Sequence, residues 1–329
     1  MKIRQFTVVF VIFLAACVSV KTPPVEEIDK SKPVTVGNTY AFIKSRNLQQ
    51  MNEVITGFTE SFPDAKIAIL DIEGKRNEKK IAEFIKINNP AVIICLGSLA
   101  AGTTINVEKK IPIIFSMVIN YRKYPELKQD NVTGISMEIP PVSLFTQFKM
   151  LLPEIDSIGV PFHPEASLEI IDDAVDSSTK MGIDLVKMEV TNPNNIVDKL
   201  SNKTDDYTGL WMIADTKLYN RKTQAIYQLI AFSKEHKKPL LVFSEAFLKP
   251  GAFFSISIDY NSLGSQTALI SRQIVQDKIT PKNIQVAPPI GTYTVLNKEI
   301  TELLLADDFD ESIYDEVDKI YGDDEEEDE

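Results

Sequence analysis

The chain has 329 residues and a formal net charge of −12, but most of that charge lies at one end. Residues 307–329 carry fourteen Asp or Glu and one Lys, so 33 acidic and 34 basic residues remain elsewhere, a net charge of +1. A near-neutral body without a Lys/Arg-rich stripe excludes nucleic acid as a partner, because binding phosphates requires clustered positive charge.

At the N-terminus, Lys2 and Arg4 precede an apolar run at residues 6–16 (FTVVFVIFLAA). Eleven helical residues span about 16 Å, roughly half of a hydrocarbon core of about 30 Å. The run is therefore too short for a membrane span and is typical of the hydrophobic region of a secretory signal.

The signal ends in Leu14-Ala15-Ala16-Cys17, which resembles the bacterial lipobox. The resemblance implies that residues 1–17 are the signal and lipobox and that Cys17 is acylated after cleavage. The protein would then be exported, facing the periplasm or cell exterior, and held to the lipid bilayer through its acyl chains. The alternative is an ordinary signal peptide that happens to end near a cysteine.

Two segments outside the predicted body are polar. Residues 18–33 contain three prolines and few apolar side chains, which predicts a tether. Residues 306–329 form an acidic tail that we expect to self-repel and remain solvated, although binding of cations or a basic partner is an alternative. Apolar residues at helical spacing before Gly322 predict one amphipathic helix within it.

The body, residues 34–305, alternates short apolar runs with amphipathic stretches and is long enough for two hydrophobic cores. This rhythm predicts an α/β fold with two doubly wound parallel-sheet lobes. Cys95 lies in one of the apolar runs (AVIICLG) and is expected to be a buried thiol. We expect strands at 34–42, 65–70, 91–96, 112–118, 157–162, 184–190, 209–214, 239–243, 253–258, 283–288 and 292–297, and helices at 46–62, 76–88, 98–109, 165–181, 193–203, 219–236 and 261–277. The stretch that joins the two series contains a further strand-like run, VTGISMEI (132–139), and a final short helix follows the last strand.

An ordered series of segments in this body resembles the substrate-binding proteins of ABC transporters, in particular the tryptophan- and tyrosine-type binding lipoproteins. The segments are KKIPIIFSMVINY (109–121), DNVTGISMEIPPVSLFTQFKMLLPEIDSIGV (130–160), GLWMIADTKLY (209–219), KKPLLVFSEAFLKPGAFFSISIDYNSLGSQTA (237–268) and TYTVLNKE (292–299). The resemblance implies a type I periplasmic-binding-protein fold, whose two lobes are joined by three crossovers and enclose a ligand cleft.

We expect these crossovers at about 119–137, 245–256 and 285–291. The N-terminal lobe would then comprise residues 34–120 plus 257–285, and the C-terminal lobe residues 138–245 plus 292–305. The cleft would lie at the carboxyl ends of the strands, where parallel sheets expose loops and helix N-termini.

Three groups of residues at predicted strand ends are candidates for ligand contact. Gly97, Ser98 and Leu99 join a strand to a helix whose free N–H groups favour an anion, although a plain helix cap has the same pattern. Ser116 with Met117, and Ser244 with Glu245, place one hydroxyl at a strand end of each lobe, which suits a polar ligand or ordinary turns.

The third group comprises Asp215 and Thr216, which follow the GLWMI strand and either meet a polar ligand group or cap the next helix. His163 follows another strand of the same lobe and is a candidate to reach the cleft. Tyr40 is a candidate to stack on an aromatic ligand, with Phe42 and Tyr219 as further aromatic candidates; the alternative for each is a place in the core.

The sequence carries no recognised catalytic, nucleotide-binding or metal-binding motif, so we expect neither an enzyme nor a cofactor. A carboxylate pair such as Asp215 with Glu245 is the remaining candidate for acid–base chemistry. The resemblance implies capture of a small molecule, such as an amino acid or aromatic compound, and delivery to an ABC permease. A ligand-sensing lipoprotein that signals to a membrane receptor is the alternative.

Overall fold

The computed structural model describes residues 38–220, 222–306 and 310–322. The predicted signal, the lipobox with Cys17 and the tether lie outside these ranges. Within them, no helix combines the length and apolar character that a membrane crossing requires.

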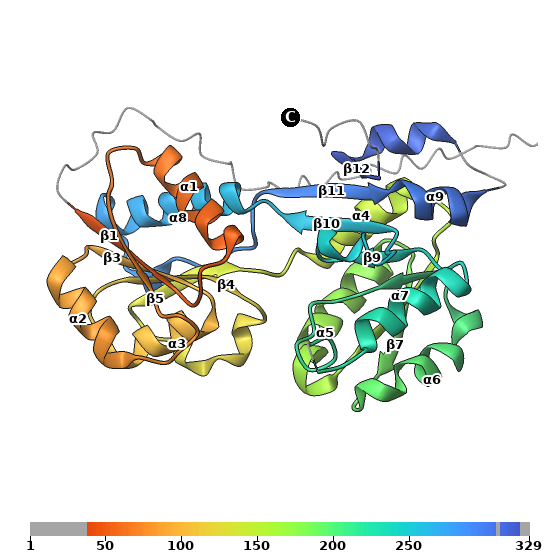
Figure 1. Cartoon of the computed structure of the whole chain (residues 1–329), viewed down its shortest axis with the longest axis horizontal. Helices are drawn as coiled ribbons and strands as arrows, with labels where there is room; N and C mark the ends of the chain where they lie inside the picture. The colour runs from red at the N-terminus through yellow and green to blue at the C-terminus, as the bar shows by residue number, and fades with distance from the viewer. Residues whose placement is uncertain (1–37, 221, 307–309, 323–329) are drawn as a thin grey trace, which may run out of the picture. The chain divides into compact units, whose positions relative to one another are not determined.

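The first sheet has five parallel strands in the order β2-β1-β3-β4-β5. Alternate residues of β1 face opposite sides: Tyr40 packs on the rings of Phe58 and Phe62, whereas Ala41 and Ile43 join the core on the other face. Figure 1 shows α1 and α8 on one face of this sheet and α2 and α3 on the other. The bounds are β1 Thr39–Lys44, α1 Gln49–Ser61, β2 Lys66–Asp71, α2 Glu78–Asn88, β3 Val92–Leu96, α3 Ser98–Val107, β4 Ile113–Val118, β5 Val132–Ser136 and α8 Tyr260–Val275.

The second sheet has seven strands in the order β12-β11-β10-β9-β8-β6-β7. It is parallel except for the antiparallel pair β10–β11, so the fully parallel prediction holds for only part of this sheet. The bounds are α4 Pro141–Leu151, β6 Ser157–Phe162, α5 Pro164–Lys180, β7 Asp184–Glu189, α6 Ile196–Ser201, β8 Gly209–Trp211, α7 Ala225–Glu235, β9 Leu240–Val242, β10 Phe254–Ile258, β11 Thr292–Asn297, α9 Lys298–Leu305 and β12 Lys319–Tyr321.

Neighbouring residues of β8 separate two cores in the second lobe. Leu210 belongs to the core with Leu200 of α6 and Leu229 of α7. Trp211 belongs to the core with Phe145 of α4, whose ring it meets edge-on at 5.3 Å between centroids. Because the strand alternates, one residue of register decides which core a side chain joins.

The chain passes between the sheets at three places within the described ranges. It runs from β5 to α4, from β10 to α8, and from the segment that lies beside β5 to β11. Before the last passage, Ala287 accepts a hydrogen bond from the Ser136 N–H at 2.9 Å and makes an isolated bridge to Ile135. The predicted strand at 283–288 is thus reduced to that bridge.

The first passage differs from its predicted position at 119–137. Residues 132–136 form β5, the edge strand of the first sheet, so that lobe extends beyond residue 120. The sequence marks residues 132–139 as strand-like, but two short 3₁₀ turns before them, Tyr121–Lys123 (η1) and Pro125–Leu127 (η2), replace the helix expected between parallel strands, so this strand was assigned to the crossover and not to the first sheet. A Cβ at Gly134 would lie 2.5 Å from the Phe115 carbonyl oxygen, so β5 approaches β4 too closely for any other residue.

The acidic segment also differs from the single solvated helix that the spacing predicts. Glu311–Glu316 form a 3₁₀ helix (η7), and β12 pairs in parallel with β11. Asp318 Oδ2 accepts hydrogen bonds from the backbone N–H and the hydroxyl of Thr294, at 2.8 and 2.7 Å. In a helix, the backbone N–H and C=O groups of this segment would bond to one another. Here those of β12 bond to the edge strand β11 instead.

Candidate ligand-binding site

A cavity of about 320 Å³ lies at the carboxyl ends of strands from both sheets. The first sheet contributes the segments that follow β4 and β5, and the second contributes those at β8, β9 and β10. Loops at this end of parallel strands are free of the sheet's hydrogen-bond ladder and so are the usual place for ligand contacts. The volume suits a small molecule.

Aromatic side chains form much of the cavity's wall. Trp211, Phe243, Tyr260 and Tyr293 all line it, beside aliphatic residues such as Ile139 and Ile170. Trp211 is held against Phe145, and Phe243 meets Phe247 edge-on at 5.1 Å. The rings are therefore fixed by packing, and they present flat apolar faces on which an aromatic or apolar group can stack.

Glu245 is the polar centre of the second lobe's side of the cavity. It opens the short 3₁₀ helix Glu245–Phe247 (η5), which Ser244 caps, and its backbone N–H donates to Ser257 Oγ at 3.0 Å. Burial, followed by the negative charge of Glu245, raises the pKa of Tyr293 to about 12. Tyr293 therefore carries its proton at neutral pH and can donate a hydrogen bond.

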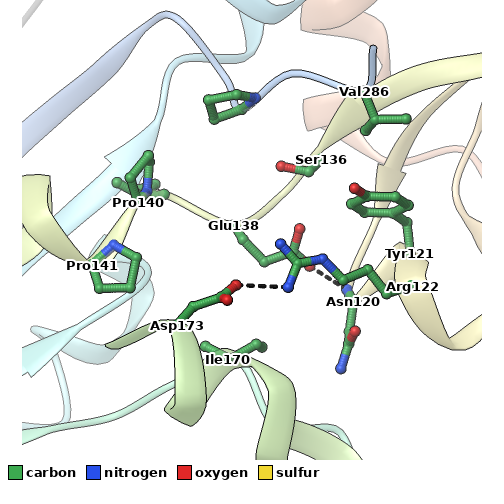
Figure 2. Close-up of a pocket in the computed structure, with 12 residues that line it drawn as sticks. Asn120, Tyr121, Arg122, Ser136, Glu138, Pro140, Pro141, Ile170, Asp173 and Val286 are labelled. Atoms are coloured by element: carbon green, nitrogen blue, oxygen red, sulfur yellow. Dashed lines mark hydrogen bonds and ion pairs between the residues drawn. The ribbon is translucent and has the colours of Figure 1, made fainter. Parts of the chain in front are cut away.

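Glu138 lies on the first lobe's side, just beyond β5, and borders both this cavity and a smaller one of about 220 Å³. Its Oε1 accepts the Asn120 N–H at 2.5 Å. Burial raises the pKa of Glu138, and the donors around it only partly offset that effect. Figure 2 shows its carboxylate directed into the same space as the side chains of Arg122 and Asp173.

The smaller cavity is bounded by contacts between the first lobe and α5. The Arg122 guanidinium pairs with Asp173 at 2.6 Å (Figure 2). The Asn120 side-chain amide donates to the Ala166 carbonyl oxygen at 2.6 Å. Both partners on the second lobe belong to α5, so the segment after β4 is tied to that helix.

A family model described as ABC transporter substrate binding protein matches residues 44–315. The chain belongs to this family. It is 21% identical over 260 residues to a tyrosine-binding protein of Clostridioides difficile (strain R20291), covering 76% of this chain and 71% of the relative.

Two solved structures share the fold of this substrate-binding family. A ligand-free, open substrate-binding protein with adhesive properties from Clostridium difficile superposes with a TM-score of 0.66 at 18% identity, covering 82% of this chain and 95% of that one. The ABC domain in complex with L-Trp from Streptococcus pneumonia superposes with a TM-score of 0.59 at 19% identity, covering 87% and 100%. The recognition of the family and its two-lobed α/β fold from sequence is confirmed.

Of the residues that the sequence proposes for ligand contact, Ser244 and Glu245 line the larger cavity of this family member. Asp215 does not line it. It is 1% exposed, and its two oxygens accept four hydrogen bonds, from the backbone N–H groups of His163, Lys217 and Leu218 and from Ser167 Oγ. Asp215 therefore fits the alternative reading, a capping residue, and is not placed for acid–base chemistry with Glu245.

His163 and Thr216 flank that buried carboxylate. The His163 Nδ1 accepts the Glu165 N–H at 3.2 Å and so caps α5. Thr216 is exposed on the loop after β8. Neither belongs to the residues that line the two cavities.

The first-lobe candidates lie outside both cavities. Gly97 has φ +91° and a Cβ there would lie 2.6 Å from Ser45 Oγ, which itself accepts the Ala100 N–H at 3.0 Å. Ser45, rather than Ser98, thus caps α3; Ser98 is exposed and Leu99 half-buried.

Ser116 and Tyr40 are core residues of the first lobe. Ser116 is fully buried inside β4, and Met117 beside it has φ +59° at a register shift between β4 and β5. Tyr40 is 3% exposed against α1, and burial raises its pKa. The core alternative is thus the one that the structure supports for Tyr40.

Sequence reasoning missed five of the residues that shape the cavities: Glu138, Trp211, Tyr260, Tyr293 and Arg122. Trp211, Tyr260 and Tyr293 do carry a signal, since each lies in or beside a predicted strand that ends at the cleft. Arg122 lies in the segment assigned to the first crossover, 119–137, and Glu138 directly follows that segment.

Proposed function

We propose that this protein captures a small molecule with an aromatic or apolar body between its lobes, outside the cytoplasm, and delivers it to an ABC permease without chemical change. The observation that carries the proposal is the aromatic-lined cavity at the strand ends of both sheets. A ligand that contacts both lobes stabilises the closed arrangement by the contacts that the open arrangement lacks. The relatives that bind tyrosine or tryptophan support an aromatic ligand.

Calorimetry with aromatic amino acids, amines and acids tests the binding. We expect saturable heat with at least one member, a higher melting temperature, and compaction in small-angle scattering. Trp211→Ala should weaken binding by about 10-fold or more, because the Trp211 ring, packed on Phe145, forms part of the cavity wall. Tyr227→Ala removes a ring that is 61% exposed on α7 and should leave binding unchanged. Absence of binding by every compound would contradict the proposal.

We further propose that Cys17 is acylated and holds the protein to the membrane. Metabolic labelling with a radioactive fatty acid should mark the wild-type chain and not Cys17→Ser, which should leave the membrane fraction. Equal labelling of both chains would reject the anchor while leaving the binding proposal intact.

A further inference from the structure

The larger cavity has charged groups of one sign only among its described lining residues. Glu138 reaches it from the segment after β5, and Glu245 reaches it from η5 of the other lobe. No Lys, Arg or His lies among the residues that line it. A ligand enclosed there meets two carboxylates and no basic side chain.

Neither carboxylate is neutralised by an ion pair within the described residues. Glu138 is half-buried and its hydrogen-bond donors are uncharged, among them the Asn120 N–H. Burial raises the pKa of Glu138 by more than the charge of Arg122 lowers it, so a cationic ligand group beside Glu138 would further offset the cost of an ionised carboxylate away from water.

The rings beside Glu245 favour the same sign of charge. Burial and the charge of Glu245 both raise the pKa of Tyr293. At Tyr260, burial raises the pKa, followed by the charges of Glu53 and Glu245. The π-faces of Trp211 and Tyr260 attract cations, and the effect strengthens when water is excluded; the Tyr293 ring already meets the Lys319 ammonium, 4.7 Å from its centroid. Carboxylates and ring faces thus together select a positive group on an apolar body.

Basic side chains near the site do not line the larger cavity. The Lys319 ammonium is 4.7 Å from the centroid of the Tyr293 ring, but Lys319 is not among the lining residues. Arg122 lines only the smaller cavity, where its guanidinium pairs with Asp173 at 2.6 Å. A ligand carboxylate in the larger cavity therefore has no basic side chain among the lining residues to pair with. Its interactions would be limited to neutral donors and repulsion from the two glutamates.

We infer that the larger cavity selects its ligand by a protonated amine on an aromatic or apolar body, with Glu138 and Glu245 as the recognising carboxylates and a ligand carboxylate dispensable. The inference rests on the proposed function and names the substrate class of that site. We therefore expect aromatic amines to bind at least as tightly as the corresponding amino acids, and both to bind more tightly than acids that lack the amine.

Calorimetry with two matched series tests this ranking: tyramine, tyrosine and 3-(4-hydroxyphenyl)propionate, and tryptamine, tryptophan and indole-3-propionate. We expect removal of the carboxylate to change the Kd by less than about 3-fold, and removal of the amine to weaken binding by about 10-fold or more, as for loss of a charge-assisted hydrogen bond.

Variants identify the groups responsible. Glu138→Gln and Glu245→Gln should each weaken binding of the tighter amine by about 10-fold. The neutral probe 4-ethylphenol or 3-ethylindole should bind these variants as it binds the wild type, which also shows that the cavity is intact. Glu235→Gln, at an exposed position on α7, is the matched control and should change nothing.

The outcomes separate the two proposals. Equal binding of amines and amine-free acids, binding that requires the carboxylate, or unchanged amine affinity in both Gln variants would overturn the charge selection and leave aromatic capture standing. Failure of every compound in both series, neutral probes included, would overturn the proposed function and the inference with it.

Discussion

The Ser167 hydroxyl donates to the Asp215 carboxylate at 2.8 Å, joining the first turn of α5 to the loop that follows β8. The same oxygen, Oδ2, accepts the His163 N–H at 2.8 Å, while Oδ1 accepts the N–H groups of Lys217 and Leu218. The carboxylate therefore fastens two loops at the carboxyl ends of neighbouring strands, directly behind the cavity wall.

Replacement of Asp215 should reduce stability and not ligand recognition. Asp215→Ala leaves four donors without their acceptor, and we expect a loss of about 3 kcal/mol or more in the free energy of unfolding. Urea denaturation measures this loss. Thr216→Ala, at the exposed neighbour, should stay within about 0.5 kcal/mol of the wild type. Unchanged stability with lost ligand affinity would instead make Asp215 a ligand contact, as its position in the sequence had suggested.

A second prediction concerns the contact between α1 and α8. Both helices approach closely because each has a glycine at the crossing. A Cβ at Gly264 would lie 2.1 Å from the Val54 carbonyl oxygen, and one at Gly57 would lie 2.0 Å from that of Asn261. Gly264→Ala should therefore force the helices apart and cost about 1–3 kcal/mol.

The matched control for that substitution is Gly102→Ala within α3. There the nearest heavy atom outside the helix backbone, Glu126 Oε1, is 3.6 Å from the added Cβ, so the methyl group fits. Alanine is favoured over glycine inside a helix, and stability should rise by about 0.5–1 kcal/mol. Equal changes in the melting temperature of both variants would contradict the steric explanation.

The pH dependence of stability should reveal the buried charge of Glu138. Since burial raises its pKa in the folded protein, the folded state binds the proton more tightly than the unfolded chain does. The cost of its charge is absent below the unfolded pKa of about 4.3 and complete above the folded pKa. Stability attributable to this group therefore falls as the pH rises between those values.

Glu138→Gln mimics the neutral form and keeps an oxygen to accept the Asn120 N–H. The variant should melt above the wild type at pH 7, and the two should converge near pH 4, as scanning calorimetry over that range measures. A difference that does not change with pH would show that packing, and not charge, is what Glu138 contributes.

The Cys95 thiol should not react with thiol reagents in the folded protein. It is fully buried, and burial raises the pKa of its thiol to about 12, so almost no thiolate is available at pH 8. For protein purified from membranes, Ellman's reagent should detect no thiol before unfolding and one per chain after it, provided that Cys17 is acylated. Two thiols after unfolding would contradict acylation, and a thiol before unfolding would contradict the burial of Cys95.

The elements that the sequence predicted well are those with long periodic patterns. The alternation of buried strands and amphipathic helices identified most of both sheets, and the family resemblance supplied their division into lobes. The edge strand β5 was recognised as strand-like but assigned to a crossover, because no helix precedes it. Helix α4 was not predicted from the pattern, although its sequence contributes to the resemblance.

The site was predicted less well, for a geometric reason. A strand end indicates a cleft, but it does not say which side chain faces it. Ser244 does line the cavity, whereas Ser116 lies two residues inside β4, which ends at Val118 as predicted, and its side chain is fully buried. Tyr40 and Tyr293 are both strand tyrosines, but Tyr40 lies near the amino end of β1 in the core, whereas Tyr293 pairs opposite Ser257 at the carboxyl end of β10, beside the cavity.

The last prediction concerns the acidic segment, whose described part pairs with β11 and contacts Tyr293. The Lys319 ammonium of β12 is 4.7 Å from the centroid of the Tyr293 ring, and Asp318 bonds to Thr294 next to that tyrosine. The strand thus fixes β11, the element that carries Tyr293 into the cavity. Truncation after residue 309 should lower the melting temperature and weaken amine binding by several-fold, because Tyr293 loses its support. A chain ending at Gly322 keeps β12 and serves as the control. If the two truncated chains bind the probe equally, the acidic segment has no part in shaping the site.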